Sequence, residues 1–271
     1  MTVPAQTASK TGDTQLVLRS VGKTFANRTV ALGDVNLAIR QGDFISLLGP
    51  SGCGKSTALR LIAGLSSPTS GLLDWRIPQA GRPDSGKHEI GFVFQEPTLL
   101  PWASVADNVW LPLRLKGVSR RAAAQRVNAV LAGVGLCGFE QAVPRELSGG
   151  MKMRVSIARA LVARPRLLLM DEPFAALDEI TRFQLNNDLL QLWQQENFTV
   201  IFVTHSVFES VFLSNRIVVM AARPGRIFGE IEVDEPYPRT APFRTSAHYG
   251  QLTRKTSAML AEAMGAEHGR Q

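Results

Sequence analysis

The stretch G-P-S-G-C-G-K-S-T at residues 49–57 constrains the fold more than any other part of the chain. It follows the apolar run F-I-S-L-L and leads into residues 55–63, whose apolar side chains have helical spacing up to Gly64. A Gly-rich loop between a buried strand and a helix turns successive backbone N–H groups toward one point, where an anion can bind. The stretch matches G-x-x-x-x-G-K-[ST] in full. It therefore predicts a nucleotide phosphate loop in which Lys55 reaches the β- and γ-phosphates and Ser56 ligates Mg²⁺.

All nine residues of this loop are predicted to contact the nucleotide: Gly49, Pro50, Ser51, Gly52, Cys53, Gly54, Lys55, Ser56 and Thr57. Cys53 occupies a variable position of the pattern, so we expect its thiol to take no chemical part. The only other cysteine, Cys137, has no metal-like or redox spacing to it, which indicates a reduced, cytosolic compartment.

Hydrophobic patterning places strands and helices along the rest of the chain. Strand patterns lie at 16–48, 90–94, 167–170, 200–203 and 217–220. Two amphipathic stretches, 104–115 and 119–133, begin at the N-cap candidates Ser104 and Ser119 and show no strand pattern. Strands that alternate with helices around continuous apolar runs indicate a covered, mostly parallel sheet. The predicted fold class is α/β: a P-loop NTPase core with an N-terminal antiparallel β part and an inserted helical subdomain.

The predicted domain organisation has three parts. Residues 1–15 are polar, lack the apolar core of a secretory signal, and are expected to form a flexible tail. Residues 16–245 form the nucleotide-binding domain, with the helical insert at about 96–160. Residues 246–271 are expected to form a last amphipathic helix and a tail. No run of about 18 apolar residues occurs, so no segment is expected to span a bilayer.

Residues 167–172, L-L-L-M-D-E, add a pair of carboxylates to the predicted site. An apolar strand that ends in Asp delivers a carboxylate to the edge of the sheet where open α/β folds bind ligands. Asp171 is predicted to hold Mg²⁺ through water, and Glu172 to act as the general base for the attacking water. The pair is a weak signal alone and a strong one beside a phosphate loop.

Two further polar residues follow predicted strands. Gln95 comes after G-F-V-F and opens the helical insert, so it is predicted to reach both Mg²⁺ and the attacking water. His205 comes after V-I-F-V-T and is predicted to contact the γ-phosphate; the alternative is a structural histidine. Ser206 and Glu209 are expected to form a capping box for the helix that follows.

The motifs G-P-S-G-C-G-K-S-T, F-Q-E-P, L-S-G-G, L-L-L-M-D-E-P, A-A-L-D and V-T-H-S occur in this order. Over roughly residues 16–240 the chain resembles the nucleotide-binding subunit of an ABC transporter. This resemblance implies ATP and Mg²⁺ as cofactors and a head-to-tail homodimer. Ser148, Gly149 and Gly150 of one subunit would then bind the γ-phosphate of ATP held by the phosphate loop of the other.

The resemblance implies two more site residues. Asp178, in A-A-L-D, would lie along the dimer seam. Phe25, in K-T-F, would stack on adenine; the alternative is a core phenylalanine at the end of a strand. The chain departs from the family pattern at Met151, where many members have Gln, and at Met153, where close relatives usually have Gln and for which the sequence offers no physical explanation. L-S-G-G-M is nevertheless similar to the importers of nitrate, alkanesulfonates and taurine.

The same resemblance implies protein partners at the membrane. Residues around Glu96–Leu115 would form a groove for a short cytoplasmic helix of a separate permease, to which a solute-binding protein delivers the solute. Trp102, Val105 and Trp110 are expected to be exposed apolar groups suited to that contact. The alternative is that they pack inside the insert, and for Trp110 both interpretations stay open.

The formal net charge of +7 permits binding to nucleic acid or to an anionic membrane. Lys and Arg are scattered along the sequence, however, and a solvated surface is the favoured explanation for them. The alternative function is a soluble ABC-type ATPase acting on nucleic acid or ribosomes, but such proteins usually fuse two cassettes or insert long coiled coils. We therefore expect no nucleic-acid partner and a peripheral place on the cytoplasmic face of the membrane. The candidate solutes are nitrate, sulfonates, taurine and the pyrimidine precursors of thiamine, and the sequence does not choose among them because the solute is not expected to touch this chain.

Overall fold

The computed structural model of the chain describes residues 13–76 and 89–268. The described chain forms two compact units. The first contains residues 13–58, 67–76 and 205–268, and the second contains residues 59–66 and 89–204. Most of the predicted N-terminal tail (residues 1–12) and the last three residues lie outside the described part. Within that part, no helix combines the length and the apolar character needed to cross a membrane.

The first unit contains an antiparallel sheet of three strands, in the order β2-β1-β4. These strands are β1 (Thr14–Thr24), β2 (Val30–Arg40) and β4 (Ser70–Trp75). Leu16 and Leu18 of β1 and Ile39 of β2 are buried, because alternate side chains of a strand share one face. The sheet confirms the predicted N-terminal antiparallel β part.

The same unit contains β3 (Phe44–Leu48), which pairs in parallel with β8 (Arg216–Ala221); β9 (Arg226–Glu232) then pairs with β8 in antiparallel. Every residue of β3 and β8 is buried, as the continuous apolar runs predict. Helix α1 (Lys55–Ile62) follows β3 through the predicted phosphate loop, and its residues from Leu59 onward are assigned to the second unit. Gly64, just after α1, has φ +70°, the conformation expected of a glycine that ends a helix.

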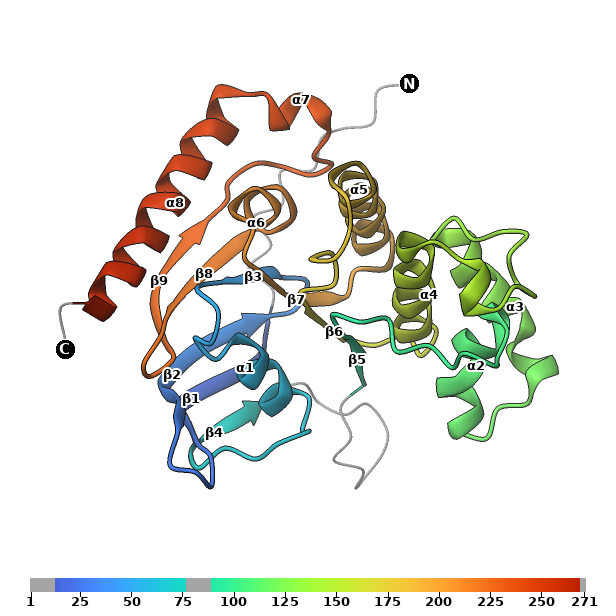
Figure 1. Cartoon of the computed structure of the whole chain (residues 1–271), viewed down its shortest axis with the longest axis horizontal. Helices are drawn as coiled ribbons and strands as arrows, with labels where there is room; N and C mark the ends of the chain where they lie inside the picture. The colour runs from blue at the N-terminus through green and yellow to red at the C-terminus, as the bar shows by residue number, and fades with distance from the viewer. Residues whose placement is uncertain (1–12, 77–88, 269–271) are drawn as a thin grey trace. The chain divides into compact units, whose positions relative to one another are not determined.

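Three C-terminal helices complete this unit: α6 (Val207–Leu213), α7 (Ala241–Arg244) and α8 (Ala247–His268). Helix α8 runs along β8 and β9 (Figure 1). The buried Arg239 fixes the end of α6, because its guanidinium donates to the carbonyls of Val211 (3.0 Å), Phe212 (3.0 Å) and Ser214 (2.9 Å). Burial lowers the pKa of Arg239.

The second unit contains three parallel strands: β5 (Ile90–Val93), β6 (Leu167–Asp171) and β7 (Thr199–Thr204). Val93 lies opposite Met170 in the β5–β6 pair, and Asp171 lies opposite Val203 in the β6–β7 pair. The carboxyl ends of these strands therefore lie at one edge. The sheets and helices confirm the predicted α/β class.

Helices make up the rest of the second unit. They are α2 (Val105–Leu115), α3 (Arg120–Gly133), the short 3₁₀ turn η1 (Pro144–Glu146), α4 (Gly149–Leu161) and α5 (Glu179–Glu196). Ser104 caps α2 and Ser119 caps α3, as their sequences predict. Helices α2, α3 and α4 pack on one another around buried apolar side chains such as Val109, Val127 and Val155 (Figure 1).

One expectation about the surface of this helical part is wrong. Val105 is fully buried, because it starts the apolar face of α2 and shares that face with Val109 one turn later. Trp102 is exposed over 78% of its surface, as expected. Trp110 is half-buried, and its Nε1 donates to the carbonyl of Val118 at 3.0 Å, so it takes part in the internal structure while remaining partly exposed.

Candidate nucleotide site

The phosphate loop joins β3 to α1 with a backbone that needs glycine. Gly52 and Gly54 have φ values of +77° and +93°, which side-chain-bearing residues rarely adopt. A Cβ on Gly54 would also lie 2.5 Å from Leu32 Cδ2 and 2.8 Å from the carbonyl oxygen of Ala31. The loop can therefore wrap tightly only because these positions have no side chain.

Lys55 turns back into the loop that it ends. It is only 4% exposed, and its ammonium group donates to the carbonyls of Gly49 (2.8 Å) and Pro50 (2.9 Å). Cys53 Sγ lies 3.9 Å from the same nitrogen and is fully buried. Lysine is a compact point charge with three donors, and here the ammonium group contacts two carbonyls and one sulfur of its own loop.

The turn between β8 and β9 packs against the phosphate loop. The Gly225 N–H donates to Ala31 (3.1 Å), and the Gly225 carbonyl accepts from Gly33 (2.9 Å). A Cβ on Gly225 would collide with the carbonyl oxygen of Cys53 inside the phosphate loop. The sequence does not predict this role of Gly225, because the contact joins segments about 170 residues apart and P-G-R indicates only a turn.

Two predicted site residues lie elsewhere in the first unit. Phe25 lies in the turn between β1 and β2 with 44% of its surface exposed and with Lys23 Nζ 5.6 Å from its ring centre. The alternative of a core phenylalanine is therefore wrong. His205 is exposed at the end of β7, just before Ser206, which caps α6 by accepting from the Glu209 N–H at 3.2 Å.

The acidic pair lies in the second unit, where β6 ends. The Glu172 N–H donates to the Val203 carbonyl at 3.1 Å, and Glu172 has φ +48°, so the chain turns sharply out of the strand at this residue. Asp171 and Glu172 are both half-buried. Gln95 is exposed two residues past the end of paired Val93, as Glu172 is two residues past Met170. The strand register thus places Gln95 at the same sheet edge as the carboxylates.

The L-S-G-G stretch forms the start of α4. Ser148 is the N-cap, with its Oγ accepting from the Met151 N–H at 3.3 Å, and both Ser148 and Gly149 are exposed. A Cβ on Gly150 would lie 2.6 Å from Cγ2 of Thr181 in α5, so glycine here lets the two helix N-termini come together. Unpaired N–H groups and the positive ends of two helix dipoles make such a place suited to an anion.

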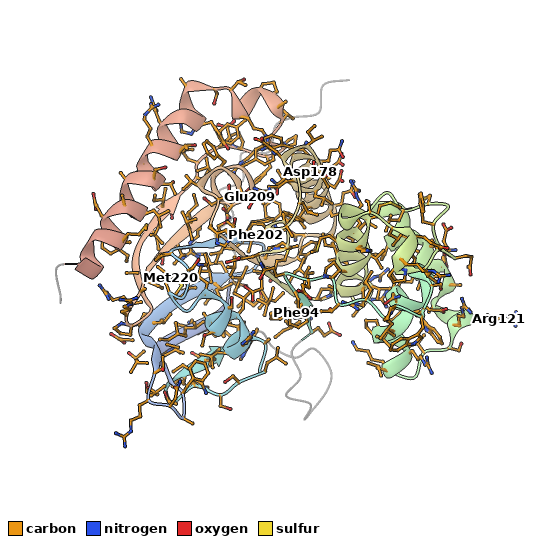
Figure 2. The ribbon with its side chains drawn as sticks, in the orientation of Figure 1. Phe94, Arg121, Asp178, Phe202, Glu209 and Met220 are labelled. Atoms are coloured by element: carbon orange, nitrogen blue, oxygen red, sulfur yellow. The ribbon has the colours of Figure 1, made fainter. Side chains whose placement is uncertain are left out.

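Asp178 is the N-cap of α5 (Figure 2) and accepts from the Thr181 N–H at 2.9 Å. That hydrogen bond lowers the pKa of the Asp178 carboxyl, which is exposed. Met153, unexplained by the sequence, is 2% exposed on α4. An apolar side chain therefore suits that position, and a flexible thioether fills interior space readily.

Residues 32–175 match a family model described as "ABC transporter", which is more than half of the chain. The chain therefore belongs to the ABC transporter family and is an ABC-type ATPase.

Similar relatives have names from the same family. An uncharacterized ABC transporter ATP-binding protein of Methanocaldococcus jannaschii is 47% identical over 86% of this chain and 85% of that protein. The aliphatic sulfonates import ATP-binding protein SsuB of Bacillus cereus is 43% identical over 87% of this chain and 91% of its own length.

Solved structures of ABC cassettes also match this chain. A dimeric post-hydrolysis state of the ATP-binding cassette MJ0796 bound to ADP and Pi matches with a TM-score of 0.70 and 34% identity, over 80% of this chain and 98% of that one. CbiO1 from Clostridium perfringens, described as part of the ABC transporter complex cbiONQ, matches with a TM-score of 0.72 and 27% identity. The match covers 82% of this chain and 89% of that one.

Proposed function

We propose that this chain hydrolyses ATP to energise the import of a small solute, of the sulfonate, nitrate or taurine type, through a separate membrane permease. The observation that supports this most is the pairing of a complete phosphate loop, folded around Lys55, with an exposed L-S-G-G helix start. The import name of the SsuB relative supports the direction and class of transport. No comparable observation favours action on nucleic acid or ribosomes.

ATP would bind with its phosphates on residues 49–57 and its adenine against the exposed ring of Phe25. The donors proposed for Mg²⁺ are the Ser56 hydroxyl, the Gln95 amide oxygen and the Asp171 carboxylate, all oxygen groups of the kind that this hard cation prefers. Gln95 and Asp171 extend from neighbouring parallel strands at their carboxyl ends, which fits a shared cation. When bound, the ion would neutralise charge on the phosphate oxygens.

The chemical step needs a base, a source of positive charge and a contact for the γ-phosphate. Glu172 would accept the proton of the attacking water as that water adds to the γ-phosphorus, while the bond from that phosphorus to the β–γ bridging oxygen breaks and ADP leaves. The Lys55 ammonium would stabilise negative charge on the β- and γ-phosphate oxygens, and its present bonds to Gly49 and Pro50 hold it in place beforehand. His205 would donate to a γ-phosphate oxygen, which its exposure permits.

Ser148, Gly149 and Gly150 would bind the γ-phosphate of ATP held by a second copy of the chain. The exposure of Ser148 and Gly149 at a helix N-terminus supports a ligand from outside this chain's own fold. Asp178 lies beside them, through the contact of Gly150 with Thr181, and would line the same seam. A head-to-tail homodimer with two composite ATP sites follows from this arrangement.

The permease contact is proposed for the exposed part of residues 96–115. Trp102, with 78% of its surface exposed, is an apolar group well suited to a docking helix, and the half-buried Trp110 would add its exposed part. The chain would then act peripherally on the cytoplasmic face of the membrane, and a solute-binding protein would act on the permease from the other side.

Solute uptake by a strain that lacks this chain tests the proposal. Uptake of labelled taurine, an alkanesulfonate or nitrate should fall in that strain. The native chain should restore uptake, and Glu172→Gln, made to the same level, should not. Uptake of all three solutes unchanged by the deletion, or restored by the inactive variant, would contradict the import function.

A further inference from the structure

The positive charge of the chain is concentrated in its helical part. Residues 96–166 contain eleven Lys or Arg against four Asp or Glu, a net charge of +7. This equals the formal net charge of the whole chain, so the remaining residues are balanced. The Lys and Arg residues are scattered along the sequence, but the cations in excess of the acidic residues all belong to the segment that folds into α2, α3 and α4.

The densest group lies where α2 turns into α3, in residues 114–121, R-L-K-G-V-S-R-R, which we call the α2–α3 corner. Its four cations, Arg114, Lys116, Arg120 and Arg121, are all exposed. Figure 2 shows Arg121 pointing outward from α3. Leu115 lies among them with 80% of its surface exposed, the highest exposure of the large apolar side chains described.

The corner has a defined backbone. The N–H groups of Lys116 and Val118 donate to the carbonyl of Leu113 at 3.1 and 3.0 Å, and Gly117 adopts φ +81° between them. Trp110 adds the bond from its Nε1 to the Val118 carbonyl, and the guanidinium of Arg114 lies 5.6 Å from the centre of the Trp110 ring. The cations and Leu115 are therefore presented together on a folded turn.

Acidic groups do not neutralise this surface. Asp107 is the only acidic residue between 105 and 133, and it pairs with Arg120 at 3.1 Å. Arg114, Lys116 and Arg121 form no ion pair within the described parts of the chain. Three exposed cations thus remain available to an anionic partner.

We propose that the α2–α3 corner binds anionic phospholipid at a membrane surface, with its cations on headgroup phosphates and Leu115 in the interfacial layer. Basic residues at an anionic bilayer gain from its negative surface potential, and an adjacent apolar side chain adds burial among the headgroups. A nucleic-acid backbone would satisfy the cations but offers no comparable place for Leu115. The interaction goes beyond the proposed ATPase function and needs neither ATP nor a permease.

Flotation of the purified full chain with lipid vesicles tests this inference. The chain should float with vesicles of phosphatidylglycerol mixed with phosphatidylcholine, remain behind with pure phosphatidylcholine, and be released as salt rises. Lys116→Glu combined with Arg121→Glu should weaken binding by at least about tenfold, since each cation contributes roughly fivefold. Leu115→Ser should weaken it about two- to fivefold without changing the salt dependence.

The matched control is Arg254→Glu with Lys255→Glu, which reverses two exposed charges on α8, outside the basic segment. It makes the same change in net charge and should retain vesicle binding. Equal losses in the two double variants would mean that net charge alone attracts the chain, and would overturn the assignment of the corner. Unchanged flotation of the corner variant, together with loss of binding to duplex DNA, would assign the surface to nucleic acid instead.

ATPase activity of the same preparations separates this inference from the proposed function. The two double-charge variants should hydrolyse ATP at the native rate in the absence of vesicles, because Lys116, Arg121, Arg254 and Lys255 belong neither to the nucleotide site nor to the proposed permease contact. A native chain that floats but hydrolyses no ATP would refute the proposed function and leave the lipid surface standing. A chain that hydrolyses ATP but never floats with vesicles would refute the lipid surface and leave the proposed ATPase function standing.

Discussion

The phosphate loop and the L-S-G-G stretch both begin a helix with serine and glycine, yet their polar groups have different partners. In the loop, Lys55 is buried and donates to two carbonyls of its own loop. At α4, Ser148 is exposed, and its hydroxyl accepts one N–H at 3.3 Å. The polar groups of the phosphate loop therefore bond within their own loop. The start of α4 is exposed and open to a ligand from outside the chain.

This difference indicates how each site can be damaged. A self-contained loop should fail when its internal contacts change, with effects on the chain that contains it. An exposed helix start should tolerate change in its own fold and show its effect on a nucleotide bound by another copy. The following predictions test that distinction.

The largest effect should come from Glu172→Gln. Loss of the general base should lower hydrolysis on the order of 10²–10⁴-fold while ATP binding remains, because glutamine is nearly the same size but cannot accept the proton. Bound ATP should then hold two copies together, so the variant should elute as a dimer with Mg-ATP. Glu196→Gln, exposed at the last residue of α5, is the control. Near-normal turnover, or a monomer under all conditions, would contradict the assignment.

Mixed dimers test whether Ser148 acts across subunits. Lys55→Ala removes the charge at the phosphate loop, and Ser148→Arg fills the helix start with a bulky side chain. Each homodimer should lose hydrolysis by about 10²-fold or more. A mixture of the two variants should recover activity, because one composite site in the mixed dimer then contains no lesion.

A reciprocal mixture makes this test decisive. A chain with both Lys55→Ala and Ser148→Arg, paired with the native chain, has one lesion in each composite site and should be inactive. If each chain used its own Ser148, that same pair would keep one intact site, and the first mixture would recover nothing. Trapping of labelled nucleotide should be followed beside hydrolysis, in case turnover requires both sites. Recovery in neither readout of verified mixed dimers would reject action in trans.

The sequence predicts the phosphate loop and the strand ends well because their structure is local. Gly52 and Gly54 are needed for their own backbone angles, and the apolar runs that become β3, β6 and β7 determine where the polar residues emerge. Helix α2 also begins as its cap Ser104 predicts.

Contacts between distant segments were not predictable in the same way. Gly225 touches Cys53 across the sequence, and Arg239 fixes α6 through carbonyls that any residues could supply. The orientation of an amphipathic helix is also a tertiary property, so Val105 and Trp102, only three residues apart, could not be separated into buried and exposed. The roles assigned to all the nucleotide-site residues stay predictions, including those of Lys55, Asp171 and Glu172.

Because the β8–β9 turn packs against the phosphate loop, Gly225→Ala should weaken both the stability of the chain and its affinity for ATP. The effect should be smaller than that of Glu172→Gln. The added Cβ would meet the Cys53 carbonyl, so the loop must shift, at a cost of about 1–3 kcal/mol in unfolding free energy. ATP affinity should fall with it, roughly tenfold. Gly250→Ala is the matched control: its Cβ would lie 3.4 Å from Arg254 Nη1 on helix α8, and it should stabilise the chain by about 0.5–1 kcal/mol. Native ATP affinity in Gly225→Ala would show that the turn does not support the loop.

The smallest predicted change compares two serine caps that have the same geometry. The hydroxyls of Ser148 and Ser119 each accept one N–H at 3.3 Å, from Met151 and Ala122. Replacement of either by alanine removes one N-cap bond and should cost a similar unfolding free energy, about 0.5–1 kcal/mol in thermal or denaturant unfolding.

Their effects on ATP hydrolysis should differ. Ser148→Ala removes a hydroxyl proposed to bind the partner's γ-phosphate and should lower hydrolysis several-fold, because the helix N–H groups that supply the rest of the binding remain. Ser119→Ala lies at the start of α3, outside the nucleotide site, and should leave the rate unchanged. Steady-state hydrolysis of both variants at saturating Mg-ATP, beside their unfolding curves, makes the comparison. Equal loss of activity in the two would mean that Ser148 acts only by stabilising the helical part, and the contrast between a self-contained loop and an outward-facing helix start would then have no functional meaning.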